Sequence, residues 1–281
     1  MNWRELLAET TATVGERPAA RWLCEVASGA DRLEDVLDEP ATRRMVAHLD
    51  VMCARYAAGE PLAYVLGRWG FRHLDLLVDE RVLIPRPETE VVAGVSIDLA
   101  RALPRPTVVA DLGTGSGAIG LSLAAELPID GITVWLTDAS DDALDVARAN
   151  LAGLGRKGAN VRIAAGSWFD ALPVDVAPDV VVSNPPYVAD GSPDVDPSVR
   201  DWEPHGALFA GPDGLDAIRL LVAGATGRIR PGGWLVLEIG ADQGPAVAAL
   251  LTSAGYADVE IRPDLTGRDR VAVGRVRPIR T

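Results

Sequence analysis

The chain has 281 residues, of which 48% are hydrophobic and 24% charged, a composition typical of a globular protein with one large domain or a medium and a small one. Its formal net charge of −13 disfavours a nucleic-acid substrate, because phosphate backbones repel an acidic surface. No run approaches the roughly 20 apolar residues that cross a membrane, and the N-terminus lacks the apolar core of a signal peptide.

Residues 1–67 are predicted to form a helical domain. Apolar side chains recur there at helical spacing, most clearly over residues 43–58. Residues 1–60 carry 7 basic and 11 acidic side chains and no chemical motif, so we expect this domain to dock a protein substrate. Cys24 and Cys53 lack the spacing of metal ligands and are predicted to be reduced thiols, which indicates a cytoplasmic protein.

Residues 68–87 are predicted to form a β-hairpin and a linker. Two short apolar runs, at 66–71 and 74–78, have the pattern of paired strands. The sequence Ile-Pro-Arg-Pro-Glu-Thr-Glu follows at 84–90, where two prolines make a stiff elbow and Glu88 or Thr89 can cap a helix over 91–103. Such a segment is more usually an ordinary linker before a helix.

From Thr107 onward, strands alternate with helices, which predicts a parallel sheet with helices on both faces. The first strand runs into a glycine-rich loop over residues 111–117. Glycines allow the backbone to approach a ligand closely at the carboxyl end of a strand. The spacing also satisfies the dinucleotide fingerprint, so the loop alone leaves both NAD and S-adenosylmethionine open.

Two further strand ends carry candidate ligand contacts. The strand over 133–137 ends at Asp138, where a carboxylate can hold a ribose diol, although it can also simply cap the next helix. The strand over 161–164 leads to Trp168, which either borders an adenine ring or belongs to the core.

The strand over 180–183 ends at Asn184, Pro185, Pro186 and Tyr187. The prolines fix φ, hold Asn184 extended and remove backbone donors. The amide oxygen of Asn184 and a proline carbonyl then form a stiff acceptor pair that suits a planar group carrying an NH₂. An ordinary proline turn would have the same local signature.

The predicted topology brings these elements together. In a doubly wound sheet the first and fourth strands are neighbours, and ligands bind beyond their carboxyl ends. We therefore expect Asp111, Asp138, Trp168 and Asn184 to converge on one crevice, and this convergence makes the site credible.

The glycine-rich loop and the Asn-Pro-Pro-Tyr motif together resemble those of class I S-adenosylmethionine-dependent amino-methyltransferases. Further blocks resemble the HemK/PrmC family; they lie at 61–64, 84–90, 168–169, 203–208, 211–215, 231–233, 237–240 and 267–270. Asn-Pro-Pro-Tyr alone is less specific, since adenine-N6 DNA methyltransferases share it.

Members of that family methylate the side-chain amide nitrogen of the glutamine in the Gly-Gly-Gln motif of class 1 release factors. The resemblance implies an α/β fold: a Rossmann-like, seven-stranded, mainly parallel sheet over 88–281, preceded by the helical domain and the hairpin. It implies S-adenosyl-L-methionine as cofactor, S-adenosyl-L-homocysteine as product, and release factors as partners of a monomer that binds neither nucleic acid nor membrane. No metal is expected, because His48, His73 and His205 are isolated in the sequence.

The resemblance also implies roles for individual residues. It assigns catalysis to Asn184, Pro185 and Tyr187. It assigns cofactor binding to Asp111, Gly113, Thr114, Gly115, Ser116, Gly117, Asp138, Trp168, Phe169 and Asn184. It assigns substrate binding to Asn184, Pro185, Pro186, Tyr187, Arg86 and Glu90.

Two other classes of function remain as alternatives. The chain could methylate another protein glutamine, as in a ribosomal protein, or adenine in nucleic acid; the Pro-Arg-Pro-Glu-Thr-Glu stretch and the acidic charge count against adenine. It could instead be a nucleotide-binding or NAD-dependent module, in which Asn-Pro-Pro-Tyr would have no role.

Overall fold

Helices alone build the N-terminal part of the chain. The computed structural model describes residues 1–193 and 195–278, and its backbone contacts divide the chain into two units. The first unit comprises Met1–Trp69 and Asp196–Trp202. Its helices are α1 (Trp3–Val14), α2 (Arg17–Ser28), α3 (Arg43–Ala57), α4 (Leu62–Leu66) and α8 (Pro197–Trp202), with a short 3₁₀ turn, η1 (Leu33–Asp35).

Capping and an apolar core explain why these helices form. The side chain of Asn2 accepts a hydrogen bond from the amide of Glu5, whose carboxylate accepts from the amide of Asn2, so both donors at the start of α1 are satisfied. Gly15 ends the helix at φ 78°, a left-handed conformation that glycine adopts without strain. The buried faces meet in a core that includes Trp3, Leu23 and Met52.

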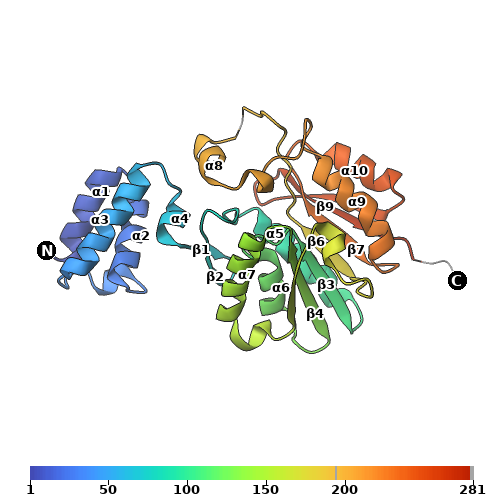
Figure 1. The fold of residues 1–281 in the computed structure, drawn as a ribbon, viewed down its shortest axis with the longest axis horizontal. Coiled ribbons are helices and arrows are strands. Elements are labelled where there is room, and N and C mark those ends of the chain that lie inside the picture. Colours follow the sequence, from blue (N-terminus) through green and yellow to red (C-terminus); the bar gives the residue numbers. More distant parts are fainter. Residues whose placement is uncertain (194, 279–281) are drawn as a thin grey trace. The chain divides into compact units, whose positions relative to one another are not determined.

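The second unit comprises Gly70–Val195 and Glu203–Thr281 and contains a seven-stranded sheet (Figure 1). The strand order is β5-β4-β3-β6-β7-β9-β8; the first five are parallel, and β9 pairs antiparallel with both β7 and β8. The strands are β3 (Thr107–Leu112), β4 (Ile132–Asp138), β5 (Val161–Ala165), β6 (Val180–Ser183), β7 (Trp234–Glu238), β8 (Ala257–Pro263) and β9 (Asp269–Arg275). This arrangement confirms the fold class predicted from the sequence.

Helices cover both faces of this sheet, with α5, α6 and α7 on one face and α9 and α10 on the other (Figure 1). Their bounds are α5 (Thr89–Ala102), α6 (Ala118–Glu126), α7 (Asp141–Gly153), α9 (Asp216–Arg228) and α10 (Gly244–Ser253). The short turns are η2 (Gly155–Gly158), η3 (Trp168–Ala171) and η4 (His205–Ala207), and β1 (Arg68–Phe71) pairs with β2 (Leu74–Leu77). Because both faces are covered, every residue of β6 is buried, which accounts for its continuous apolar run.

The order of connections creates the site. From β3 the chain winds outward through β4 to β5, and it then returns to place β6 on the other side of β3. The loops that leave β3 and β6 therefore diverge to opposite faces, and a crevice opens between them at the carboxyl ends of the strands.

A close approach between α9 and η3 generates a stability test. A Cβ atom added to Gly224 would lie 2.7 Å from Cδ2 of Phe169, whereas one added to the exposed Gly227, in the same helix, would meet nothing within 4 Å. We expect Gly224→Ala to lower the free energy of unfolding by about 1–3 kcal/mol through overpacking, less any gain in helix propensity. Gly227→Ala should be neutral or stabilising by up to about 1 kcal/mol. Urea unfolding checks both, and equal stability of the two variants would contradict the packing argument.

Candidate active site

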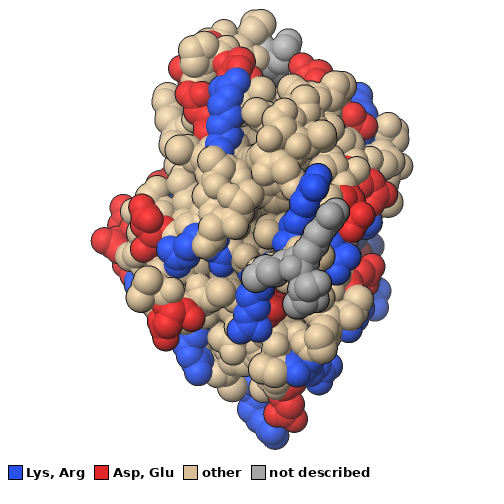
Figure 2. All heavy atoms as spheres, turned by 90° about the vertical axis from the view of Figure 1, so that its right-hand side faces the viewer, with Lys and Arg blue, Asp and Glu red and all other residues tan. Residues whose placement is uncertain are grey.

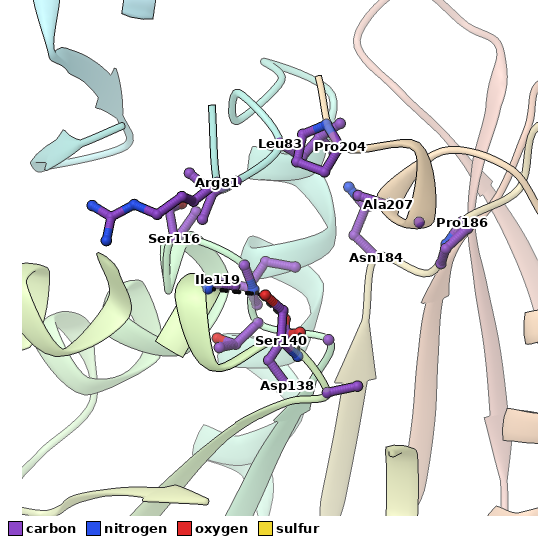
Figure 3. Close-up of a pocket in the computed structure, with 18 of the residues that line it drawn as sticks. Arg81, Leu83, Ser116, Ile119, Asp138, Ser140, Asn184, Pro186, Pro204 and Ala207 are labelled. Carbon is purple, nitrogen blue, oxygen red and sulfur yellow. Dashed lines mark hydrogen bonds between the residues drawn. The ribbon is translucent and has the colours of Figure 1, made fainter. Parts of the chain in front are cut away.

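A cavity of about 540 Å³ lies at the carboxyl ends of β3, β4, β5 and β6 (Figure 3). All of its lining residues belong to the second unit. The predicted site residues among them are Gly113, Thr114, Gly115, Ser116, Asp138, Trp168, Asn184 and Pro186. The tertiary structure thus brings the ends of four strands around one space, as the predicted topology requires.

The glycine-rich loop forms one wall of this cavity. Gly113, Gly115 and Gly117 have φ of 73°, 55° and 87°, a region that side chains with a Cβ rarely adopt. The amides of Gly113 and Thr114 both donate to the carbonyl of Thr137 at 2.9 Å, which holds the loop against the end of β4. Gly117 lies outside the cavity lining and serves as the N-cap of α6.

Asp111 holds the loop from beneath. Its side chain is buried, and Oδ2 accepts from Oγ1 of Thr114 at 2.6 Å and from the amide of Gly120 at 2.9 Å. Burial raises the pKa of this carboxyl to about 6, although both hydrogen bonds oppose the shift. Within the described part of the chain, Oδ1 has no hydrogen-bond partner. Asp111 is absent from the cavity lining, so its direct effect is on the shape of the loop.

Asp138 is the last residue of β4, and its carboxylate binds the glycine-rich loop. Its Oδ2 accepts from the amide of Gly115 and its Oδ1 from the amide of Ser140, both at 2.9 Å. The carboxylate lines the cavity (Figure 3). Since an ionised carboxylate has about four acceptor sites, two amides leave it able to accept from a ligand.

The neighbours Trp168 and Phe169 enter different environments. Trp168 lines the cavity, and its ring lies against Gly113, where an added Cβ would be 3.3 Å from Cζ3. Its φ of 46° is uncommon for a bulky residue and turns the ring toward the loop. Phe169 is buried within the core on the α9 side of the sheet, and Trp168 also packs against that core. The structure therefore brings Trp168, and not Phe169, to the cavity.

The Asn-Pro-Pro-Tyr motif also divides between cavity and interior. Asn184 and Pro186 line the cavity, whereas Pro185 and Tyr187 do not (Figure 3). The hydroxyl of Tyr187 donates to Oε1 of Glu238 at 3.2 Å. Burial, and secondly the Glu238 carboxylate, raise the pKa of Tyr187, so its hydroxyl stays protonated as a donor.

Arg86 and Glu90 lie beside the cavity and not in its lining. Nη2 of Arg86 pairs with Oε1 of the buried Glu203 at 2.5 Å, and Oε2 of Glu203 accepts from the amide of Ile84 at 3.1 Å. Glu90 accepts from the amide of Arg72 at 2.9 Å, next to the β1–β2 turn. In this structure Glu90 holds the backbone at Arg72 directly, and Arg86 holds the backbone at Ile84 through Glu203.

Several lining residues had no role in the sequence-based prediction. They are Arg81, Val82, Leu83, Pro85, Thr89, Ala118, Ile119, Ala139, Ser140, Ala143, Gly166, Ser167, Pro204, Gly206 and Ala207. The 84–90 and 203–208 blocks, which carried the family resemblance, contain some of them and were the available signal.

Within residues 1–193 and 195–278, no group of three or more His, Cys, Asp or Glu side chains is arranged to hold a metal. No described helix is long and apolar enough to span a membrane.

The buried Asp111 predicts a pH-dependent stability difference. Because its folded pKa is about 6 against an ordinary value of 3.8, the native state binds the proton more tightly, and stability falls as pH rises across that window. Asp111→Asn does not titrate. We therefore expect the stability of the variant relative to wild type to rise by about 2 kcal/mol between pH 4 and 7, most of the limit set by 1.36 kcal/mol per pKa unit. Urea unfolding of both proteins across this range measures the difference, and a pH-independent difference would refute it.

Comparisons with known proteins agree with this geometry. The model of the Methyltransferase small domain family matches residues 94–199. A release factor glutamine methyltransferase from Xylella fastidiosa is 45% identical over 239 residues, which cover 85% of this chain and 84% of the relative. One from Gloeobacter violaceus is 41% identical over 278 residues, with 96% and 95% covered.

A crystal structure of a methyltransferase from Pyrococcus furiosus is similar in fold, with a TM-score of 0.53, 18% identity, and coverage of 80% of this chain and 98% of that one. The fold is thus that of methyltransferases. The identities above 40% extend over most of both sequences, and on that basis the chain belongs to the release factor glutamine methyltransferase family.

Proposed function

We propose that this protein transfers a methyl group from S-adenosyl-L-methionine to the side-chain amide nitrogen of the glutamine in the Gly-Gly-Gln motif of class 1 release factors, in the cytoplasm, and so supports translation termination. The observation that carries the proposal is the position of the Asn184 carboxamide, which lines the same cavity as the glycine loop and Asp138. The names of the relatives at 41–45% identity support the substrate class.

The residues around the cavity fit this cofactor. Asp138 retains acceptor capacity for the two ribose hydroxyls, and Trp168 offers an apolar ring beside the loop for the adenine. The left-handed glycines leave the loop backbone free of Cβ atoms where a ligand approaches. When bound, S-adenosyl-L-methionine would supply the methyl group from its sulfonium and leave as S-adenosyl-L-homocysteine.

The protein's own task is to make a poor nucleophile reactive. The lone pair of an amide nitrogen is delocalised into its carbonyl. Two acceptors, Oδ1 of Asn184 and the carbonyl oxygen of Pro185, would take the two N–H groups, orient the nitrogen and favour its pyramidal form. Pro186 stiffens this acceptor pair, and acceleration comes from positioning and preorganised electrostatics.

The acidic charge argues against a phosphate-backbone substrate. The net charge is −13, and acidic side chains lie among the basic ones on the face shown in Figure 2.

The decisive experiment is methyl transfer to purified release factor, with the modified residue mapped by mass spectrometry. A release factor whose Gly-Gly-Gln glutamine is replaced by alanine is the control. Methylation of that control to the same extent, or no methylation of the natural factor, would overturn the proposal.

Two substitutions should separate cofactor binding from catalysis. Asp138→Ala removes a charged acceptor worth about 1.5–3 kcal/mol, so the affinity for S-adenosyl-L-methionine should fall about 10- to 150-fold. Asn184→Ala should leave this affinity largely intact, because the side chain points at the substrate, and lower turnover about 10²–10³-fold, the effect of removing one preorganised polar contact. Calorimetry measures the affinities and single-turnover methylation the rates. If Asn184→Ala reacted at the wild-type rate, Asn184 would not hold the substrate amide.

We propose further that residues 1–67 form a helical domain that docks the protein substrate. Residues 68–87 form a β-hairpin and linker, and residues 88–281 form the methyltransferase domain. The first unit has its own apolar core, so its surface can bind a protein partner independently of the cavity in the second unit. Trp22 is 41% exposed there and packs edge-on against Trp69, with ring centroids 5.6 Å apart. Exposed aromatic side chains of this kind commonly anchor protein interfaces.

A deletion of residues 1–67, which leaves β1 complete, tests the docking role. The shortened chain should bind S-adenosyl-L-methionine normally and methylate a short peptide containing Gly-Gly-Gln at the rate of the full chain. It should methylate the intact release factor at least about tenfold more slowly, because the peptide needs only the cavity. Equal rates on the intact factor would show that residues 1–67 do not contribute to docking.

A further inference from the structure

A chain of hydrogen bonds leads from the cavity into the interior of the sheet. Nδ2 of Asn184 donates to Oγ1 of Thr89 at 3.4 Å, and that hydroxyl donates to Oε2 of Glu238 at 2.6 Å. Thr89 and Glu238 are 3% and 1% exposed, so water does not compete for the bond between them. The three residues come from the end of β6, the start of α5 and the end of β7.

The direction of this chain follows from counting protons. The hydroxyl of Thr89 has one proton, and the Glu238 carboxylate, which can only accept, takes it at short range. The lone pairs of Oγ1 are then all that Thr89 can present to Asn184, so only the NH₂ end of the carboxamide can face it. Oδ1 of Asn184 must consequently occupy the other side of the amide.

The other oxygen of Glu238, Oε1, also accepts a hydrogen bond from a hydroxyl. The hydroxyl of Tyr187 donates to Oε1 of Glu238, while Nη1 of Arg270 donates to the Tyr187 oxygen at 3.5 Å and to the carbonyl of Ile239 at 3.0 Å. Arg270 thus directs the proton of Tyr187 toward Glu238. Each carboxylate oxygen receives one hydroxyl proton, which holds Glu238 as an acceptor on both sides.

We propose that Thr89 and Glu238 are positioning residues that hold the Asn184 carboxamide with its oxygen available to the substrate amide. The inference rests on the proposed function, because it assigns a role within the same site. We call the hydrogen bonds from Asn184 through Thr89 to Glu238 the relay. A carboxamide is nearly symmetric in shape, and without the relay its two orientations would differ little in free energy. An Asn184 with its NH₂ toward the substrate would offer a donor to a donor and could not bind the amide.

Protonation of Glu238 should reverse the relay. A neutral Glu238 can donate to Thr89, whose own proton then points to Asn184 and favours the opposite orientation of the carboxamide. Burial raises the pKa of Glu238 to about 7, opposed by Thr89, Arg270 and Tyr187 and reinforced by the carboxylate of Glu88. The catalytic orientation is therefore expected above about pH 7 and is lost as pH falls through that value.

Replacement of the Thr89 hydroxyl tests the relay. Thr89→Val keeps the shape and should lower turnover about 10- to 100-fold with unchanged cofactor affinity, whereas Thr89→Ser should retain most of the activity. Ser96→Ala is the matched control, since it removes another buried hydroxyl of α5, one that bonds the carbonyl of Val92 at 2.9 Å outside the relay. In wild type, turnover should decline below about pH 7, and Thr89→Val should lose this inflection. A purely structural role would lower stability and leave the inflection in place.

Glu238→Gln provides a second variant of almost unchanged shape. Its turnover should be independent of pH between 6 and 8 and equal to that of wild type at low pH. If Thr89→Val and Glu238→Gln both turned over at pH 8 as fast as the wild-type protein, the relay would be refuted. Absence of methyl transfer by the wild-type protein would overturn the proposed function instead.

A readout without substrate keeps the two failures distinct. The side-chain NH₂ signals of Asn184 in a ¹⁵N spectrum, assigned by their loss in Asn184→Ala, should shift with pH with a midpoint near 7. Thr89→Val should abolish this shift. An identical titration in wild type and Thr89→Val would refute the relay, whatever the enzyme methylates.

Discussion

The site depends on how one buried carboxylate shapes the turn from β3 into α6. Asp111 receives the hydroxyl of Thr114 and the amide of Gly120 on a single oxygen, so the loop between them must curl back over the end of the strand. This curl points the amide of Gly115 at Asp138, whose other oxygen caps the turn into α7 at Ser140. One continuous set of hydrogen bonds thus joins the ends of β3 and β4 and determines where polar groups meet the cavity.

A second buried carboxylate, Glu238, has the corresponding place at the end of β7. Asp111 and Glu238 are each 1% exposed, and burial raises the pKa of both. Desolvation of a carboxylate is costly, and short hydrogen bonds from Thr114 and Thr89, both at 2.6 Å, offset part of that cost. In both cases the ionised group orders a neighbouring segment and lies outside the lining of the cavity.

The opposite rim of the cavity is ordered by charge pairing over a long sequence separation. Glu203 binds Arg86 and the amide of Ile84, more than 100 residues earlier in the chain. The stiff Pro-Arg-Pro elbow is thereby tied to the segment that contributes Pro204, Gly206 and Ala207 to the lining. Because Glu203 is buried, loss of either partner would leave an uncompensated charge, so the pair favours a single arrangement of the rim.

The strands, the helices and the positions of the strand ends could be predicted from local sequence patterns. The apolar run of β6, the glycines after β3 and the proline pair after Asn184 are local signals, because they restrict φ and ψ or require burial wherever they occur. The alternation of strands and helices then predicted that Asp111, Asp138, Trp168 and Asn184 would converge on one crevice. The last three line one cavity, whereas Asp111 lies outside its lining.

Local patterns did not predict which side chains face that cavity and which support it, because this depends on how distant segments pack together. Phe169 packs under α9 while its neighbour Trp168 lies against the loop, a division that no local pattern encodes. Tyr187 and Thr89 share Glu238, which follows Thr89 by 149 residues. Such partners meet because β7 lies beside β6 in the sheet. Hydrogen bonds between distant residues depend on strand order and register, which hydrophobic periodicity and turn chemistry do not specify.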